Sequence, residues 1–77
     1  MIFIVAANHR HANICAENEG LSPRQWRYVS SADDLRGHSE GEVIFYETWH
    51  QHPDALEISQ YVQMAERIGR LKSRNGR

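Results

Sequence analysis

The chain divides into short apolar runs and amphipathic stretches, and the first apolar run stands at its beginning. Residues 1–7 (Met-Ile-Phe-Ile-Val-Ala-Ala) are all apolar, and the run stops at Asn8. A run this short and this rich in β-branched residues is typical of a strand buried on both faces. Such a strand lies in the middle of a parallel sheet with helices on either side, and it is too short to cross a membrane.

Two further segments favour strands. Residues 26–30 alternate, so that Trp26, Tyr28 and Ser30 share one face. Residues 43–49 form a nearly continuous run of apolar and β-favouring residues.

Helical patterns separate and follow these strands. Asn8 is a good N-cap, Gly20 suits a helix end, and the residues between them predict a helix over 9–19 whose small inward face includes Cys15. Residues 31–37 predict a helix of one or two turns with Leu35 as its apolar anchor. Pro53 begins a last helix that is expected to run to about residue 71, with an apolar stripe at three- and four-residue steps made of Ile58, Tyr61, Val62, Ala65, Ile68 and Leu71.

This order of elements, β-α-β-(short α)-β-α, predicts a small α/β fold. Right-handed crossovers place the first strand in the middle of a three-stranded, mostly parallel sheet with the order 2-1-3. We expect one domain over residues 1–72 and a frayed basic segment over residues 73–77. The segment 31–41 is close to the minimum for a parallel crossover, so an antiparallel third strand stays open at this point.

Length and charge narrow the picture further. The 77 residues suit one marginally stable domain, and a single cysteine excludes an internal disulfide and favours a reducing compartment. The first residues lack the basic region and cleavage site of a signal peptide. The net charge of −1 conceals an asymmetry, because residues 1–66 hold all ten acidic residues whereas residues 67–77 hold basic residues and no acid.

Two His-x-His motifs, His9-Arg10-His11 and His50-Gln51-His52, directly follow predicted strands. Because the loops after parallel strands gather at one edge of a sheet, where ligands of open α/β folds bind, we expect the two motifs to lie near each other. Together with Glu47 or Asp54 they could bind zinc or a similar ion, although neither motif chelates easily alone, and surface histidines are the commoner outcome. The expected ligand or partner surface consists of Asn8, His9, Arg10, His11, Trp49, His50 and His52.

Catalytic and nucleotide-binding patterns are missing from the sequence. No glycine-rich phosphate loop follows the first strand, and without glycines the backbone cannot wrap a phosphate closely. Cys15 falls on the buried face of its helix, which favours a core residue over a nucleophile. The serines lie in caps and turns, so we expect no enzyme and no cofactor.

The basic segment and the sheet edges are the remaining candidates for binding. Arg67, Arg70 and Arg74 lie three or four residues apart and could form one stripe. Together with Lys72 they could contact nucleic acid or an acidic protein surface. The acidic body argues against nucleic acid without excluding it. Each open edge of the sheet is a template for pairing with another chain, and exposed aromatic residues would favour such an interface.

The strand ending in Asn8-His9-Arg10, the segment from Gly20 to Val29, the step Leu35-Arg36-Gly37 and the third apolar strand resemble short open reading frames of actinobacteriophages. The resemblance covers most of residues 1–65, and the arrangement also looks like half of a Rossmann-like or P-loop sheet without the phosphate loop. It implies a viral accessory protein in the cytoplasm of a bacterial host, acting by binding a host protein. Self-association is the other interaction that we expect of the chain. The resemblance assigns no chemistry to any residue.

Overall fold

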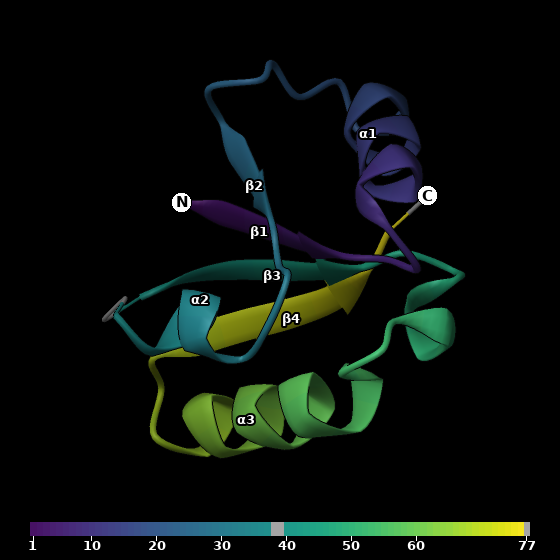
Figure 1. Cartoon of the computed structure of the whole chain (residues 1–77). Coiled ribbons are helices and arrows are strands. Elements are labelled where there is room, and N and C mark those ends of the chain that lie inside the picture. Colours follow the sequence, from purple (N-terminus) through teal and green to yellow (C-terminus); the bar gives the residue numbers. More distant parts are fainter. Residues whose placement is uncertain (38–39, 77) are drawn as a thin grey trace.

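The computed structural model describes residues 1–37 and 40–76. It shows a parallel four-stranded sheet with helices on both faces (Figure 1). The strands lie in the order β2-β1-β3-β4 and are β1 (Ile2–Val5), β2 (Trp26–Tyr28), β3 (Gly41–Phe45) and β4 (Leu71–Asn75). The helices are α1 (His9–Asn18), α2 (Asp33–Arg36) and α3 (Ala55–Arg67), with a short 3-10 turn, η1 (Trp49–Gln51).

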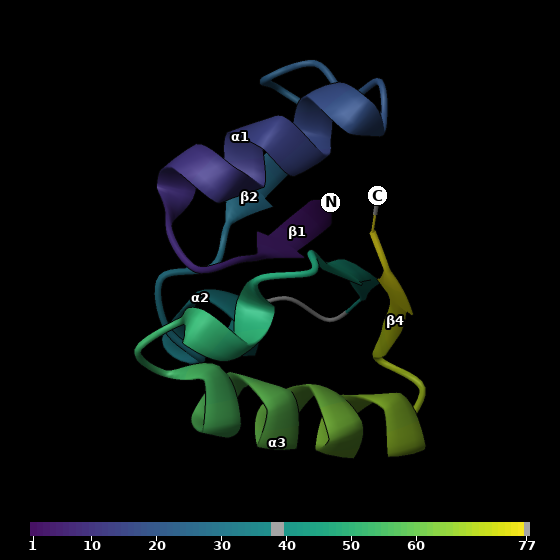
Figure 2. The ribbon, with the colours of Figure 1, turned by 90° about the vertical axis from the view of Figure 1, so that its right-hand side faces the viewer.

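The first apolar run is a central strand buried on both faces, as its sequence predicts. Phe3 and Val5 of β1 belong to the core beneath α2 and α3, whereas Ile4 belongs to the core beneath α1. Figure 2 shows the resulting layers, with α1 on one side of the sheet and α3 on the other. This arrangement explains why β1 carries no polar residue, because from Phe3 to Val5 both of its faces are covered.

Helix α1 follows its sequence signals closely. The Asn8 side-chain oxygen accepts a hydrogen bond of 2.9 Å from the His11 backbone N–H, and Gly20 closes the helix with a φ of 72°. Ala12, Cys15 and Ala16 are buried against the sheet. The small inward face lets α1 lie close to β1 and β2, which confirms the expected first half of a βαβ unit.

The third strand is parallel to the first, with Phe3 opposite Val43, so the open question of its direction is settled in favour of a parallel crossover. The expectation of a three-stranded sheet is wrong, however. Residues 71–75 form β4, which pairs in parallel with β3 along its whole length. The expected frayed segment over residues 73–77 is therefore strand as far as Asn75, and Gly76 still donates its N–H to the Phe45 carbonyl at 2.9 Å; Arg77 lies outside the described residues.

The reason for this difference is the place where α3 ends. The helix stops at Arg67 rather than at residue 71, because Gly69 adopts a φ of 76°, which is incompatible with a continuing helix. Glycine adopts this positive φ without the steric penalty that a Cβ atom would cause. The Gly69 N–H bonds the Glu66 carbonyl and the Arg70 N–H bonds the Ala65 carbonyl, which is a Schellman motif. The chain then turns back, and Leu71 enters the core with 3% of its surface exposed.

Candidate functional site

The predicted contact residues lie at the carboxyl edge of the sheet, where β1 and β3 end side by side. This is the switch point of the strand order, since the chain moves outward from β1 to β2 on one side and to β3 and β4 on the other. Thr48 joins the two loops there. Its hydroxyl oxygen accepts a hydrogen bond from the Ala7 N–H at 3.3 Å and lies 2.9 Å from His11 Nδ1. The side chains of the two loops thus bond to each other at the switch point.

The two histidines of the first motif, His9 and His11, lie against different aromatic rings. The His9 ring lies 5.8 Å from the Trp26 ring and 5.4 Å from the Tyr28 ring, measured between centroids. The His11 ring lies 6.2 Å from that of Tyr46, edge to face. His9 therefore points toward β2 and His11 toward β3.

His52 is a structural residue. It is buried, with 5% of its surface exposed. Its Nε2 lies 2.8 Å from the Val29 carbonyl oxygen, which only accepts, so Nε2 carries the proton. Its Nδ1 accepts the Asp54 backbone N–H at 2.9 Å. Both ring nitrogens are occupied, and none remains to bind a metal.

Of the other predicted surface residues, Asn8, Arg10 and His50 are exposed, whereas Trp49 is half-buried against the core. His50 is exposed and its ring lies 3.9 Å from the Trp49 ring, while Arg10 is exposed at the start of α1. Of the four histidines in the two motifs, His9 and His52 lie against a common ring, that of Tyr28. Within residues 1–37 and 40–76, no three His, Cys, Asp or Glu side chains are placed to hold a metal ion, so the metal-binding alternative gains no support.

The thiol and phenol near this region are held in their neutral forms. Burial raises the pKa of Cys15, and the neighbouring Glu19 carboxylate raises it further, whereas Arg74 acts in the opposite direction. Burial and the Asp54 carboxylate likewise raise the pKa of Tyr28. A thiol with a raised pKa is a poor nucleophile, so its surroundings favour the core role expected for Cys15.

The basic segment splits into two parts. Arg74 donates to Glu42 at 2.6 Å and to Glu19 at 2.7 Å, and these bonds raise the pKa of its guanidinium. It thereby ties β4 to β3 and to the end of α1. Arg67, Arg70 and Lys72 are exposed, and none of them forms an ion pair with another described residue.

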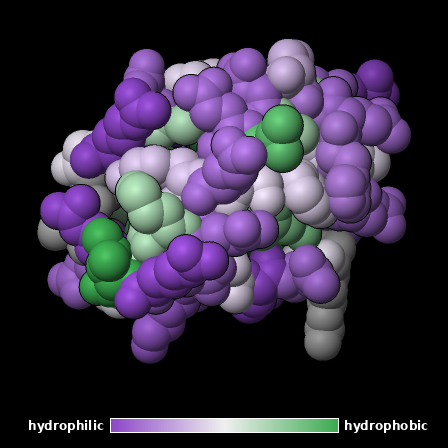
Figure 3. Space-filling model, turned by 90° about the horizontal axis from the view of Figure 1, so that it is seen from below, coloured by the Kyte–Doolittle hydropathy of each residue, from purple (hydrophilic) through white to green (hydrophobic). Residues whose placement is uncertain are grey.

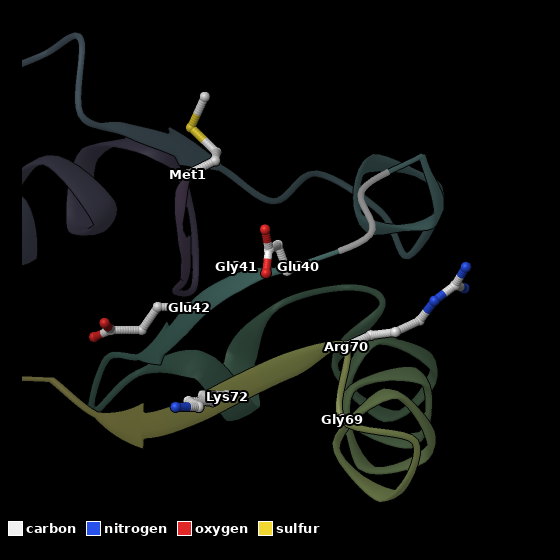
Figure 4. Close-up of a pocket in the computed structure, with 7 residues that line it drawn as sticks. All are labelled: Met1, Glu40, Gly41, Glu42, Gly69, Arg70 and Lys72. Atoms are coloured by element: carbon white, nitrogen blue, oxygen red, sulfur yellow. The ribbon is translucent and has the colours of Figure 1, made fainter.

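A pocket of about 400 Å³ lies at the opposite, amino edge of the sheet, between the starts of β1, β3 and β4. Its charged side chains are Glu40, Glu42, Arg70 and Lys72. Figure 4 shows that these side chains do not converge, since Arg70 extends away from the pocket. The pocket therefore offers no centre at which several polar groups could hold one ligand.

A smaller groove of about 180 Å³ runs between α3 and β4. Phe45 and Trp49 line it, with ring centroids 5.0 Å apart. The remaining lining residues come from the two flanking elements and are Ser59, Val62, Gln63, Glu66, Ser73 and Asn75. Of the predicted surface residues, only Trp49 borders it. The groove does not follow from the sequence pattern because it depends on β4, and the helix-ending Gly69 is the one local signal for that strand.

No family model, curated protein or solved structure matches this chain in the comparisons made. In the part of the chain that the structure describes, no helix has both the length and the apolar character needed to cross a membrane.

Proposed function

We propose that this chain is a small non-catalytic interaction module that binds an extended, acidic segment of another protein along β4. One observation carries the proposal: β4 is a five-residue strand at the end of a parallel sheet, with an aromatic-lined groove beside it. A strand with an open edge and a groove for side chains is the arrangement used when proteins bind peptides by adding a strand.

The free backbone groups of β4 support this role. The Gly76 N–H points to β3, where it bonds Phe45. Since backbone groups alternate in direction along a strand, those of Leu71, Ser73 and Asn75 point away from β3. An added chain can bond to these groups, and in Figure 2 no other element lies beyond β4 on that side.

The groove would supply selectivity. Successive side chains of an added strand point to alternate faces, so every second one would face the groove between α3 and β4. The half-buried rings of Phe45 and Trp49 form its apolar part. An apolar side chain of the partner would bury these rings further.

The charges favour an acidic partner over a second copy at this edge. If two copies of β4 paired antiparallel about Ser73, Lys72 of each would lie opposite Arg74 of the other, and like charges in such positions destabilise a sheet. A basic edge strand is a common protection against self-pairing. Lys72, together with the exposed Arg67 and Arg70, would attract carboxylates, whereas Arg74 is already paired within its own chain.

The resemblance to actinobacteriophage open reading frames indicates where this partner would be. A phage accessory protein of this kind would meet its partner in the cytoplasm of the bacterial host. The proposed partner is therefore a host protein with an exposed acidic segment.

Affinity capture from a nuclease-treated bacterial lysate tests the proposal. The bait is compared with Ser73→Pro, which removes an outward N–H without removing a bond to β3, and with Ser73→Ala as the matched control. We expect one dominant host protein to be retained by the wild type and by Ser73→Ala, and its capture to fall roughly tenfold with Ser73→Pro.

A second variant, Trp49→Ala, should weaken the same capture by emptying part of the groove. Circular dichroism and thermal melting establish that each variant is folded. Equal capture by Ser73→Pro and Ser73→Ala would exclude strand addition at β4. The capture is repeated from a lysate that has not been treated with nuclease, and a partner retained only there would favour a nucleic-acid role for the basic side chains.

A further inference from the structure

Helix α3 carries an exposed apolar ridge on the side that faces away from the sheet. Leu56, Met64 and Ile68 are 73%, 50% and 61% exposed, and with Gln60 they form one row of four-residue steps. Figure 3, which looks at the molecule from the side of α3, shows hydrophobic patches separated by hydrophilic side chains. Large exposed side chains in a row along one helix are characteristic of a helix–helix contact.

The charged side chains beside this ridge have opposite signs at the two ends of α3. Asp54 and Glu57 lie at the start of α3, and Arg67 and Arg70 lie at its end. An antiparallel second copy, centred on Val62, would place each residue opposite the one equally far from Val62 in the partner.

The pairing that results is complementary at the two ends of the helix, with one mixed polar and apolar contact nearer its centre. Leu56 would meet Ile68, and Gln60 would meet Met64. Glu57 would meet Arg67, and Asp54 would meet Arg70. A parallel pairing would instead bring like charges together, and it would align the two helix dipoles.

We propose that α3 is a homodimer interface and that two copies of the chain associate through this ridge with their α3 helices antiparallel. The surface differs from the groove beside β4, so the proposal does not depend on the partner proposed there. A helix of 13 residues is about 20 Å long, which gives a small interface. We therefore expect a concentration-dependent dimer with a Kd in the micromolar range, about 1–100 μM.

A charge-reversal experiment tests the pairing. Sedimentation velocity over a range of concentrations measures the Kd of the wild type, of Glu57→Arg and of Arg67→Glu. Each single variant places like charges opposite each other twice in a symmetric dimer, so we expect its Kd to rise about tenfold or more. An equimolar mixture of the two variants restores both opposite-charge contacts, and the mixture should dimerise about as well as the wild type.

Two further variants make the result decisive. Glu66→Arg reverses an exposed charge of α3 that lines the groove beside β4, outside the ridge, and it should leave the Kd unchanged. Leu56→Gln removes an exposed apolar contact and should weaken the dimer, whereas it cannot disturb the core. Because Glu57 also lies 3.9 Å from Arg36 of its own chain, thermal melting is measured for each variant.

The proposal is overturned if the wild type stays monomeric up to millimolar concentration. It is also overturned if the dimer withstands both single reversals or if their mixture fails to restore association. A dimer abolished by Ser73→Pro but not by the α3 variants would assign self-association to the edge of β4 instead. None of these outcomes alters the separate test of partner capture.

Discussion

At the scale of single residues, the motif His50-Gln51-His52 shows how differently two histidines of one motif are used. His50 is exposed and lies against Trp49, whereas His52 is buried and bonds Val29 and Asp54. The sequence identifies both as residues that follow a strand. Only the three-dimensional approach of the Val29 carbonyl, 23 positions away, distinguishes them.

A pair of alanine variants tests this difference. His52→Ala leaves the Val29 carbonyl and the Asp54 N–H without partners and opens a cavity, so we expect it to lower the free energy of unfolding by about 2–4 kcal/mol. His50→Ala should change it by less than about 0.5 kcal/mol, as is usual at exposed positions. Urea denaturation of both variants measures the difference, and equal effects would contradict the structural role of His52.

A second residue, Asp34, makes stability depend on pH. Its carboxylate accepts hydrogen bonds from the Ser30 hydroxyl and N–H, both at 2.7 Å, and from the Ser31 N–H at 3.3 Å. The bonds from Ser30 hold its pKa below the usual value near 3.8 despite partial burial, with smaller contributions from Ser31 and Arg27. Because the folded state lowers this pKa, the stabilisation is complete above the usual value and is lost as the pH falls through the lowered one.

We therefore expect Asp34→Asn to destabilise the protein by about 1 kcal/mol at neutral pH, and by progressively less as the pH falls below the usual carboxyl value and through the lowered pKa of Asp34. Denaturation of wild type and variant across this range is the measurement. Asp33→Asn is the control, because Asp33 is exposed and its carboxylate pairs with Arg36 rather than with the backbone. A difference at Asp34 that is independent of pH would show that the ionised carboxylate is not what matters.

At the scale of elements, the sequence predicts what local signals decide and misses what distant contacts decide. β1, α1 and β3 are long or strongly patterned, and their positions follow from apolar runs, a cap and a helix-ending glycine. β4 has one buried residue, Leu71, in an otherwise polar segment, and its existence depends on an uncovered edge of β3. No local periodicity signals such a strand, although Gly69 marks the end of α3 as clearly as Gly20 marks that of α1.

The candidate site divides in the same way. Sequence reasoning places the two His-x-His motifs correctly after β1 and β3, since that needs only the order of strands. Whether the four rings converge depends on side-chain neighbours such as Tyr28 and Thr48, which come from other segments. The edge and groove at β4 could not be proposed before β4 itself was known.

The bridge made by Arg74 provides a test at this scale. Arg74→Met removes contacts of β4 with β3 and α1, and we expect it to lower the free energy of unfolding by about 1 kcal/mol. Lys72→Met lies on the same face of the same strand, is exposed, and should have little effect. Thermal melts at low and high salt compare the two, and the loss at Arg74 should shrink as salt screens the pairs.

At the scale of the whole molecule, the fold brings the basic segment onto the acidic body. Arg74 of the basic segment forms ion pairs with Glu19 and Glu42 of the acidic body. Part of the charge asymmetry of the sequence is therefore neutralised within one chain. The basic side chains that stay exposed beside the open edge of β4 are Arg67, Arg70 and Lys72. The basic segment is thus both a part of the sheet and the charged border of the proposed binding surface.

This double role predicts the effect of removing residues 71–77. The deletion removes Leu71 from the core and removes the ion pairs that Arg74 forms with acidic side chains. It also exposes the edge of β3, which contains the apolar residues Val43 and Ile44. A domain of this length has only about 4–12 kcal/mol of stability, so we expect the shortened chain to lose cooperative thermal unfolding and to aggregate through β3. The double variant Arg70→Gln/Lys72→Gln removes charge but no strand, and it should melt like the wild type while binding an acidic partner more weakly. If the shortened chain instead melted cooperatively near the wild-type temperature, β4 would be an appendage rather than a part of the sheet, and deletion could then be used to study binding.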